Sequence, residues 1–173
     1  MKLSFLSAAM IFVASNTIAQ HAHQFNSTSE TGQSQFAEIA EIVSLLRDDP
    51  ETNWAQVDIK ALREHLVDMD NVTTKASVER TVDKLVVTFL ITGDEVATAS
   101  IQRMVLAHSP MLQQSSDWSV IAQEQEGGAK MMIQVSSEDD LNQVLGLGFF
   151  GVMTIGAHHQ QHHLMVATGQ SPH

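Results

Sequence analysis

The chain has 173 residues and no cysteine, which suits one domain with a short appendage and excludes disulfides, thiolate metal sites, iron–sulfur clusters and a cysteine nucleophile. Its 9 Lys and Arg against 20 Asp and Glu give a formal net charge of −11. Because an acidic chain is a poor ligand for a phosphate backbone, we expect no nucleic-acid partner.

The amino-terminal residues 1–19 have the pattern of a secretory signal peptide. Lys2 precedes an apolar run from Leu3 to Ala14, and small residues precede a cleavage point after Ala19. The apolar run is too short to span a membrane. We therefore expect a periplasmic or secreted protein with no integral membrane segment once the signal peptide is removed.

The rest of the chain divides into a polar stretch and a globular body. Residues 20–35 are poor in apolar side chains and predict a flexible leader, whereas residues 36–173 predict a single domain with a His-rich C-terminal segment. Apolar residues at helical spacing predict helices over residues 36–46 and 58–72. Asp58 is the expected N-cap of the second helix.

Strand-like and helical runs alternate through the middle of the chain. They fall at residues 75–82, 85–92, 95–108, 119–125, 129–136 and 138–153. Pro110 is expected to end or kink the helix over 95–108. Ser136 or Ser137 caps the helix over 138–153, and residues 157–169 either continue that helix or form a short fifth one.

The helix at 58–72 aligns with residues 97–111 at an offset of 39. At this offset Leu62 aligns with Ile101 and Leu66 aligns with Val105, and a hairpin follows both helices. Two helix–hairpin units predict an α+β fold of two layers related by a pseudo-twofold axis. We expect a four-stranded antiparallel sheet built from the two repeats, with the helices packed on one face.

Histidine and methionine are the chemical signal, with 9 of each in the chain. His65 and Met69 are four residues apart, as are Met104 and His108, so each pair projects from one helix face. The repeat aligns His65 with Met104 and Met69 with His108. If the helices face each other, the four side chains form a His2Met2 set. Neutral imidazole and thioether ligands favour copper, and Cu(I) in particular.

A second group of candidate ligands lies near the C-terminus. It consists of Met153, His158, His159, His162 and His163. Positions 158/162 and 159/163 are helical i, i+4 pairs, and we expect one pair to face inward and the other outward. We expect deletion of residues 157–173 to leave the His2Met2 set intact, and an approach of the His158 region to His108 is left open. For every one of these side chains the alternative is a structural role, since methionine fills cores well.

Three glycines interrupt the helical pattern near the C-terminus. Gly146, Gly148 and Gly151 each cost about 1 kcal/mol relative to alanine inside a helix. Close packing against another helix is the first explanation. A break in the helix is a second, and a flat ligand such as haem against the backbone is a third.

These patterns predict an exported soluble protein that binds copper through His and Met, for metal tolerance or delivery. The alternatives are a haem-b protein with His and Met axial ligands, and an interaction domain without metal. No nucleophile signature is present, so the sequence does not indicate an enzyme. The metal ion is the expected partner, and a homodimer is left open.

Overall fold

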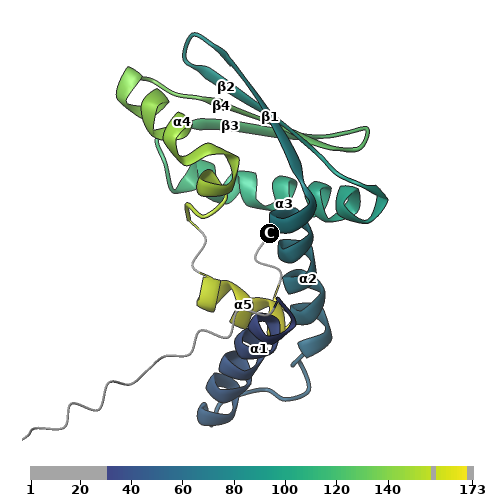
Figure 1. The fold of residues 1–173 in the computed structure, drawn as a ribbon. Helices are drawn as coiled ribbons and strands as arrows, with labels where there is room; N and C mark the ends of the chain where they lie inside the picture. The colour runs from purple at the N-terminus through teal and green to yellow at the C-terminus, as the bar shows by residue number, and fades with distance from the viewer. Residues whose placement is uncertain (1–30, 157–158, 171–173) are drawn as a thin grey trace, which may run out of the picture.

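The computed structural model describes residues 31–156 and 159–170, and over these it has the predicted α+β fold (Figure 1). The expected signal peptide and residues 20–30 of the expected leader lie outside the described residues. Residues 31–35, which the sequence assigns to the leader, form the beginning of the first helix.

Five helices and four strands make up the described part of the chain. In chain order they are α1 (Thr31–Asp48), α2 (Ile59–Lys75), β1 (Ser77–Asp83), β2 (Val86–Thr92), α3 (Glu95–Gln114), β3 (Ser119–Gln125), β4 (Gly128–Gln134), α4 (Glu138–Val152) and α5 (His159–Ala167). The C-terminal segment is therefore a separate fifth helix and not a continuation of α4.

Three helices begin at side-chain caps that satisfy their first backbone N–H groups. Asp58, Asp94 and Ser137 each accept a hydrogen bond from the backbone N–H three residues later, at 3.0, 2.8 and 3.1 Å. Such caps stabilise a helix by about 1 kcal/mol each. The cap of α4 is Ser137, one of the two serines that the sequence offers.

The antiparallel sheet has the strand order β1-β2-β4-β3, so the second strand of each hairpin lies at its centre. This order is symmetric about the β2–β4 pair, as two repeated helix–hairpin units require. Alternate residues of the central strands are buried, among them Phe89 and Ile91 on β2 and Met131 and Ile133 on β4. Helices α3 and α4 cover this face (Figure 1).

Buried apolar side chains form two separate cores. The sheet core lies between the sheet and helices α3 and α4, and the C-terminal part of α2 reaches it through Val72. The helical core joins α1, α2 and α5, and its buried members are Ile42, Leu46, Leu62, Leu66 and Ala167. Helix α2 belongs to both cores, whereas α1 and α5 lie side by side away from the sheet (Figure 1).

The helix α3 continues through Pro110 to Gln114, whereas the sequence predicts an end or kink near that proline. Proline removes one backbone hydrogen bond from the helix interior. Burial of Leu112, in the last turn of α3, contributes about 1.5–3 kcal/mol, which offsets much of that loss.

The helix α4 is broken at Gly148, where φ is 61° and ψ is −174°. Only glycine adopts this conformation without strain. A Cβ atom placed on Gly146 or Gly148 would meet no atom within 4 Å. Close helix packing, the first explanation from the sequence, is therefore wrong for these two positions. A break in the helix is the explanation for Gly148.

Candidate metal centre

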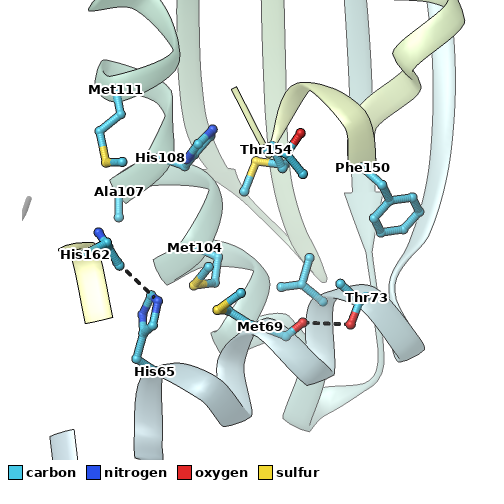
Figure 2. Close-up of a pocket in the computed structure, with 12 residues that line it drawn as sticks. His65, Met69, Thr73, Met104, Ala107, His108, Met111, Phe150, Thr154 and His162 are labelled. Carbon is cyan, nitrogen blue, oxygen red and sulfur yellow. Dashed lines mark hydrogen bonds between the residues drawn. The ribbon is translucent and has the colours of Figure 1, made fainter. Parts of the chain in front are cut away.

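A cavity of about 170 Å³ lies where α2, α3, α5 and the C-terminal end of α4 meet (Figure 2). Its lining includes three histidines and four methionines, all of which carry potential metal-donor atoms. They are His65, Met69, Met104, His108, Met111, Met153 and His162. Most of the remaining lining is apolar and includes Val72, Ala107 and Phe150.

Helix geometry directs four of these side chains into the cavity. His65 and Met69 lie one turn apart on α2, and Met104 and His108 lie one turn apart on α3. Residues four apart share a helix face, so each helix presents one imidazole and one thioether. In Figure 2 the side chains of Met69 and Met104 extend toward each other from the two helices. The structure therefore brings both predicted pairs into one cavity.

The closest contact between donors joins His65 to His162 of α5. Their Nε2 atoms are 3.2 Å apart, and the ring centroids are 4.7 Å apart. In the absence of metal, one ring donates a hydrogen bond to the other, with the direction set by the tautomers. A metal with bonds of about 2.0 Å to nitrogen separates two tetrahedral ligand atoms by about 3.3 Å. The pair is thus spaced as two ligands of one ion are spaced.

His108 is buried, with 6% of its surface exposed. Its Nε2 atom is 3.4 Å from the backbone carbonyl oxygen of Val152, at the end of α4. If this nitrogen donates its proton to the carbonyl, Nδ1 of the neutral ring is the nitrogen that carries a lone pair. Backbone carbonyls commonly orient metal-binding imidazoles in this way.

His163 takes a different position from its neighbour in sequence. It is 2% exposed and does not line the cavity. Its Nδ1 atom is 3.4 Å from Oε2 of Glu38 on α1, and its ring centroid is 5.6 Å from that of His65. His163 is therefore packed beside the His65–His162 pair, but it does not line the cavity.

The described side chains of the expected C-terminal ligand group do not form a site apart from the first one. His162 and Met153 join the cavity, and His163 is buried beside Glu38. The sequence predicts that one i, i+4 pair faces inward and the other outward, yet one member of each pair is turned toward the protein. His158 lies outside the described residues, and of His159 only the backbone, at the start of α5, is described.

Met111 lines the cavity but is absent from the ligands that the sequence predicts. Together with Met104 and His108 it follows the spacing i, i+4, i+7, so all three share one face of α3. Because Pro110 predicts an end or kink of the helix, the sequence pattern stops short of Met111. The helical spacing that includes Met111 is present in the sequence, but the expected end of the helix at Pro110 left Met111 out of the predicted ligands.

Donors other than sulfur are few around the cavity. Among residues 31–156 and 159–170, no group of three or more histidine, aspartate or glutamate side chains is arranged to hold a metal ion. The cavity lining contains no carboxylate. A metal bound between His65 and His162 would therefore need methionine sulfur to complete its coordination.

Comparison of the chain with protein-family models, with curated proteins and with solved structures finds no match. The fold and the cavity therefore define the class on their own: a small α+β protein with a His/Met cavity between two cores. Within the described segments, no helix has the length and apolar character needed to cross a membrane.

Proposed function

We propose that this protein binds Cu(I) in the His/Met cavity and serves copper tolerance or delivery. The observation that carries the proposal is the convergence of side chains from four helices on one small cavity. Of the residues that the sequence suggests as ligands, the cavity collects His65, Met69, Met104, His108, Met153 and His162. These residues span 98 positions of the chain, from 65 to 162, so local sequence does not account for their meeting.

The donor chemistry favours Cu(I) over other common ions. Thioether sulfur is a soft ligand that suits Cu(I), whereas Mg²⁺ and Ca²⁺ need oxygen ligands. Zinc sites usually combine histidine with thiolate or carboxylate, and the cavity has neither.

Charge favours a monovalent ion as well. The histidine and methionine donors are neutral when they bind metal, and no acidic side chain lines the cavity. Burial of a charge without a counter-charge is costly, and the cost rises with the charge of the ion. A single positive charge is therefore easier to hold here than two.

The size of the cavity supports an ion over haem. Pockets for small organic ligands usually measure about 300–1,000 Å³, and this one measures about 170 Å³. Haem would have to displace several lining side chains. A visible spectrum of the purified protein tests this alternative, because bound haem gives a Soret band.

The apolar lining favours a second candidate, a small apolar ligand. An apolar protein cavity of about 150 Å³ binds benzene, and this cavity has a similar volume. Thermal unfolding with and without benzene tests this candidate. A rise in the midpoint temperature that Met69→Phe abolishes would support it.

Export is also part of the proposal, and it rests on the signal-peptide pattern of residues 1–19. A soluble periplasmic or secreted protein that uses sulfur from methionine needs no free thiol in an oxidising compartment. The intact mass of protein purified from that compartment tests cleavage after Ala19.

The direct experiment is an anaerobic Cu(I) titration of untagged protein against a chromogenic Cu(I) chelator. We expect one tight site per chain in the wild-type protein. The double variant Met69→Leu/Met104→Leu keeps side-chain volume and removes two sulfurs, and we expect an affinity loss of at least about 10-fold. His65→Ala/His108→Ala should lose at least about 100-fold.

The matched control is Met132→Leu. Met132 lies on β4 opposite Thr88 and Ile121 and does not line the cavity. The Cu(I) affinity of this variant should therefore equal that of wild type. Wild-type affinity in both double variants would refute the His/Met site. The absence of any tight Cu(I) binding to the wild-type protein would refute the proposed function itself.

A further inference from the structure

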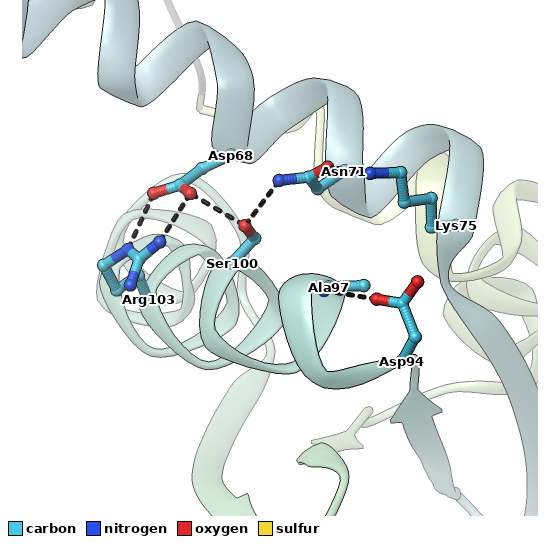
Figure 3. Close-up of polar contacts among 7 residues, drawn as sticks. All are labelled: Asp68, Asn71, Lys75, Asp94, Ala97, Ser100 and Arg103. Atoms are coloured by element: carbon cyan, nitrogen blue, oxygen red, sulfur yellow. Dashed lines mark hydrogen bonds and ion pairs between the residues drawn. The ribbon is translucent and has the colours of Figure 1, made fainter.

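A polar network joins α2 to α3 outside the cavity. The carboxylate of Asp68 accepts hydrogen bonds from Arg103 Nε at 2.7 Å and from Arg103 Nη2 at 2.6 Å (Figure 3). Asp68 is 13% exposed, whereas Arg103 is 61% exposed. Two parallel bonds between a guanidinium and a carboxylate fix the relative orientation of the groups, because both are planar.

The network continues into the buried contact between the two helices. Ser100 Oγ donates to Asp68 Oδ1 at 2.8 Å and accepts from Asn71 Nδ2 at 3.0 Å. Lys75 Nζ in turn donates to Asn71 Oδ1 at 2.7 Å (Figure 3). Ser100 and Asn71 are both buried. A satisfied buried network specifies one arrangement of the helices, whereas apolar side chains alone tolerate sliding and rotation.

The network residues immediately precede two of the proposed ligands. Asp68 is followed by Met69, and Arg103 is followed by Met104. Successive residues of a helix are rotated by about 100°, so a fixed Asp68–Arg103 contact fixes where the next side chains point. None of the four network residues Asp68, Asn71, Ser100 and Arg103 lines the cavity. Apart from an electrostatic interaction between Asp68 and His65, they act on its ligands through the helix backbone.

We propose that the Asp68–Ser100–Asn71–Arg103 network is a positioning element of the metal site. It sets the rotation and spacing of α2 and α3, and thereby directs the sulfurs of Met69 and Met104 to the same ion. This inference rests on the proposed Cu(I)-binding function and names the residues that prepare its site before metal arrives.

The test is Cu(I) affinity of Asp68→Asn, measured by chelator competition at 25 °C after circular dichroism shows that the variant is folded. The amide keeps the shape of the side chain but removes its charge and one acceptor. Loss of a group that hydrogen-bonds a metal ligand typically costs about 10–100-fold in affinity. Because this network acts through the backbone, we expect a loss at the lower end, about 10-fold. The matched control is Asp70→Asn, which makes the same charge change on α2 outside the network.

A double-mutant cycle distinguishes positioning from general stability. If Asp68 acts through the methionines, Asp68→Asn should weaken binding about 10-fold in the wild type and by less than about 2-fold in the Met69→Leu/Met104→Leu background. A merely structural role predicts the same loss in both backgrounds. Equal losses would therefore overturn the inference.

Arg103→Lys is the second variant, and its Cu(I) affinity tests the network if Asp68→Asn does not fold. Lysine keeps the charge and loses the planar fork, so we expect an intermediate loss of affinity. If wild type binds Cu(I) tightly and network variants match Asp70→Asn, the positioning role is wrong and the metal site stands. If the wild type itself does not bind Cu(I), both proposals fall.

Discussion

At the scale of single residues, opposing effects set the pKa of the Asp68 carboxyl. Burial alone would raise the pKa of Asp68, but hydrogen bonds from Arg103 and Ser100, together with the charge of Arg103, outweigh it. The pKa of Asp68 therefore lies below its ordinary value of 3.8. Asp68 is ionised in the folded protein over the whole range from neutral to mildly acidic pH.

This shift predicts a pH dependence of stability. Because folding lowers the pKa, ionised Asp68 stabilises the protein above about pH 4, and the contribution is lost as pH falls through the folded-state pKa. We expect Asp68→Asn to lower the free energy of unfolding by about 1–2 kcal/mol at neutral pH. The difference from wild type should shrink toward pH 3.

Urea unfolding of both proteins across this pH range measures the effect. Asp70→Asn serves again as control and should show a smaller change at neutral pH. A difference between Asp68→Asn and wild type that stays constant down to about pH 3 would contradict the assignment.

At the scale of single elements, α4 contains a matched pair of glycines. Gly146 has helical backbone angles and Gly148 has a positive φ of 61°, and both have open space where a Cβ atom would lie. Backbone conformation is therefore the main difference between them. Alanine suits the first position and is strained at the second.

Alanine substitutions at these glycines should change stability in opposite directions. We expect Gly146→Ala to raise the free energy of unfolding by up to about 1 kcal/mol. Gly148→Ala should lower it by about 1–2 kcal/mol, because a Cβ disfavours left-handed backbone. Thermal or urea unfolding of the two variants measures both effects. Destabilisation of equal size in both would mean that Gly148 does not break α4 for conformational reasons.

At the scale of the whole molecule, the cavity lies between two cores that share α2. Met69 packs against the helical core, whereas Met104 and Met153 pack against the sheet core. His162 comes from α5, which belongs to the helical core through Ala167. An ion bound by side chains from both groups would therefore tie the two cores together.

This arrangement predicts the effect of metal and of truncation on α5. Cu(I) should slow amide hydrogen exchange in α5 and α1, because ligand binding stabilises the elements that hold it. Deletion of residues 157–173 should weaken Cu(I) binding and speed exchange in α1, since it removes His162 and uncovers the helical core. The sequence by itself predicts an intact site after that deletion.

Hydrogen-exchange mass spectrometry with and without Cu(I) measures this coupling. The peptide that covers β3 is the internal control, because β3 contributes no residue to the cavity. Tight Cu(I) binding with unchanged exchange in α5 would show that His162 is not a ligand.

The sequence by itself determined the features that depend on near neighbours along the chain. Helix caps such as Asp58, the two hairpins and the repeated helix–hairpin order follow from residues within a few positions of one another. The shared helix faces of His65 with Met69 and of Met104 with His108 follow in the same way. Periodicity carries this information because helices and strands have fixed repeats.

Only the tertiary structure decided which of these faces meet. His162 lies beside His65 across 97 residues, and no local pattern encodes that contact. Met111 lies in the cavity because α3 continues past Pro110, where Leu112 is buried in the sheet core. The break at Gly148 likewise follows from a backbone conformation that sequence spacing does not reveal. These features depend on contacts between distant segments or on the backbone conformation of the folded chain, so local preference along the sequence does not determine them.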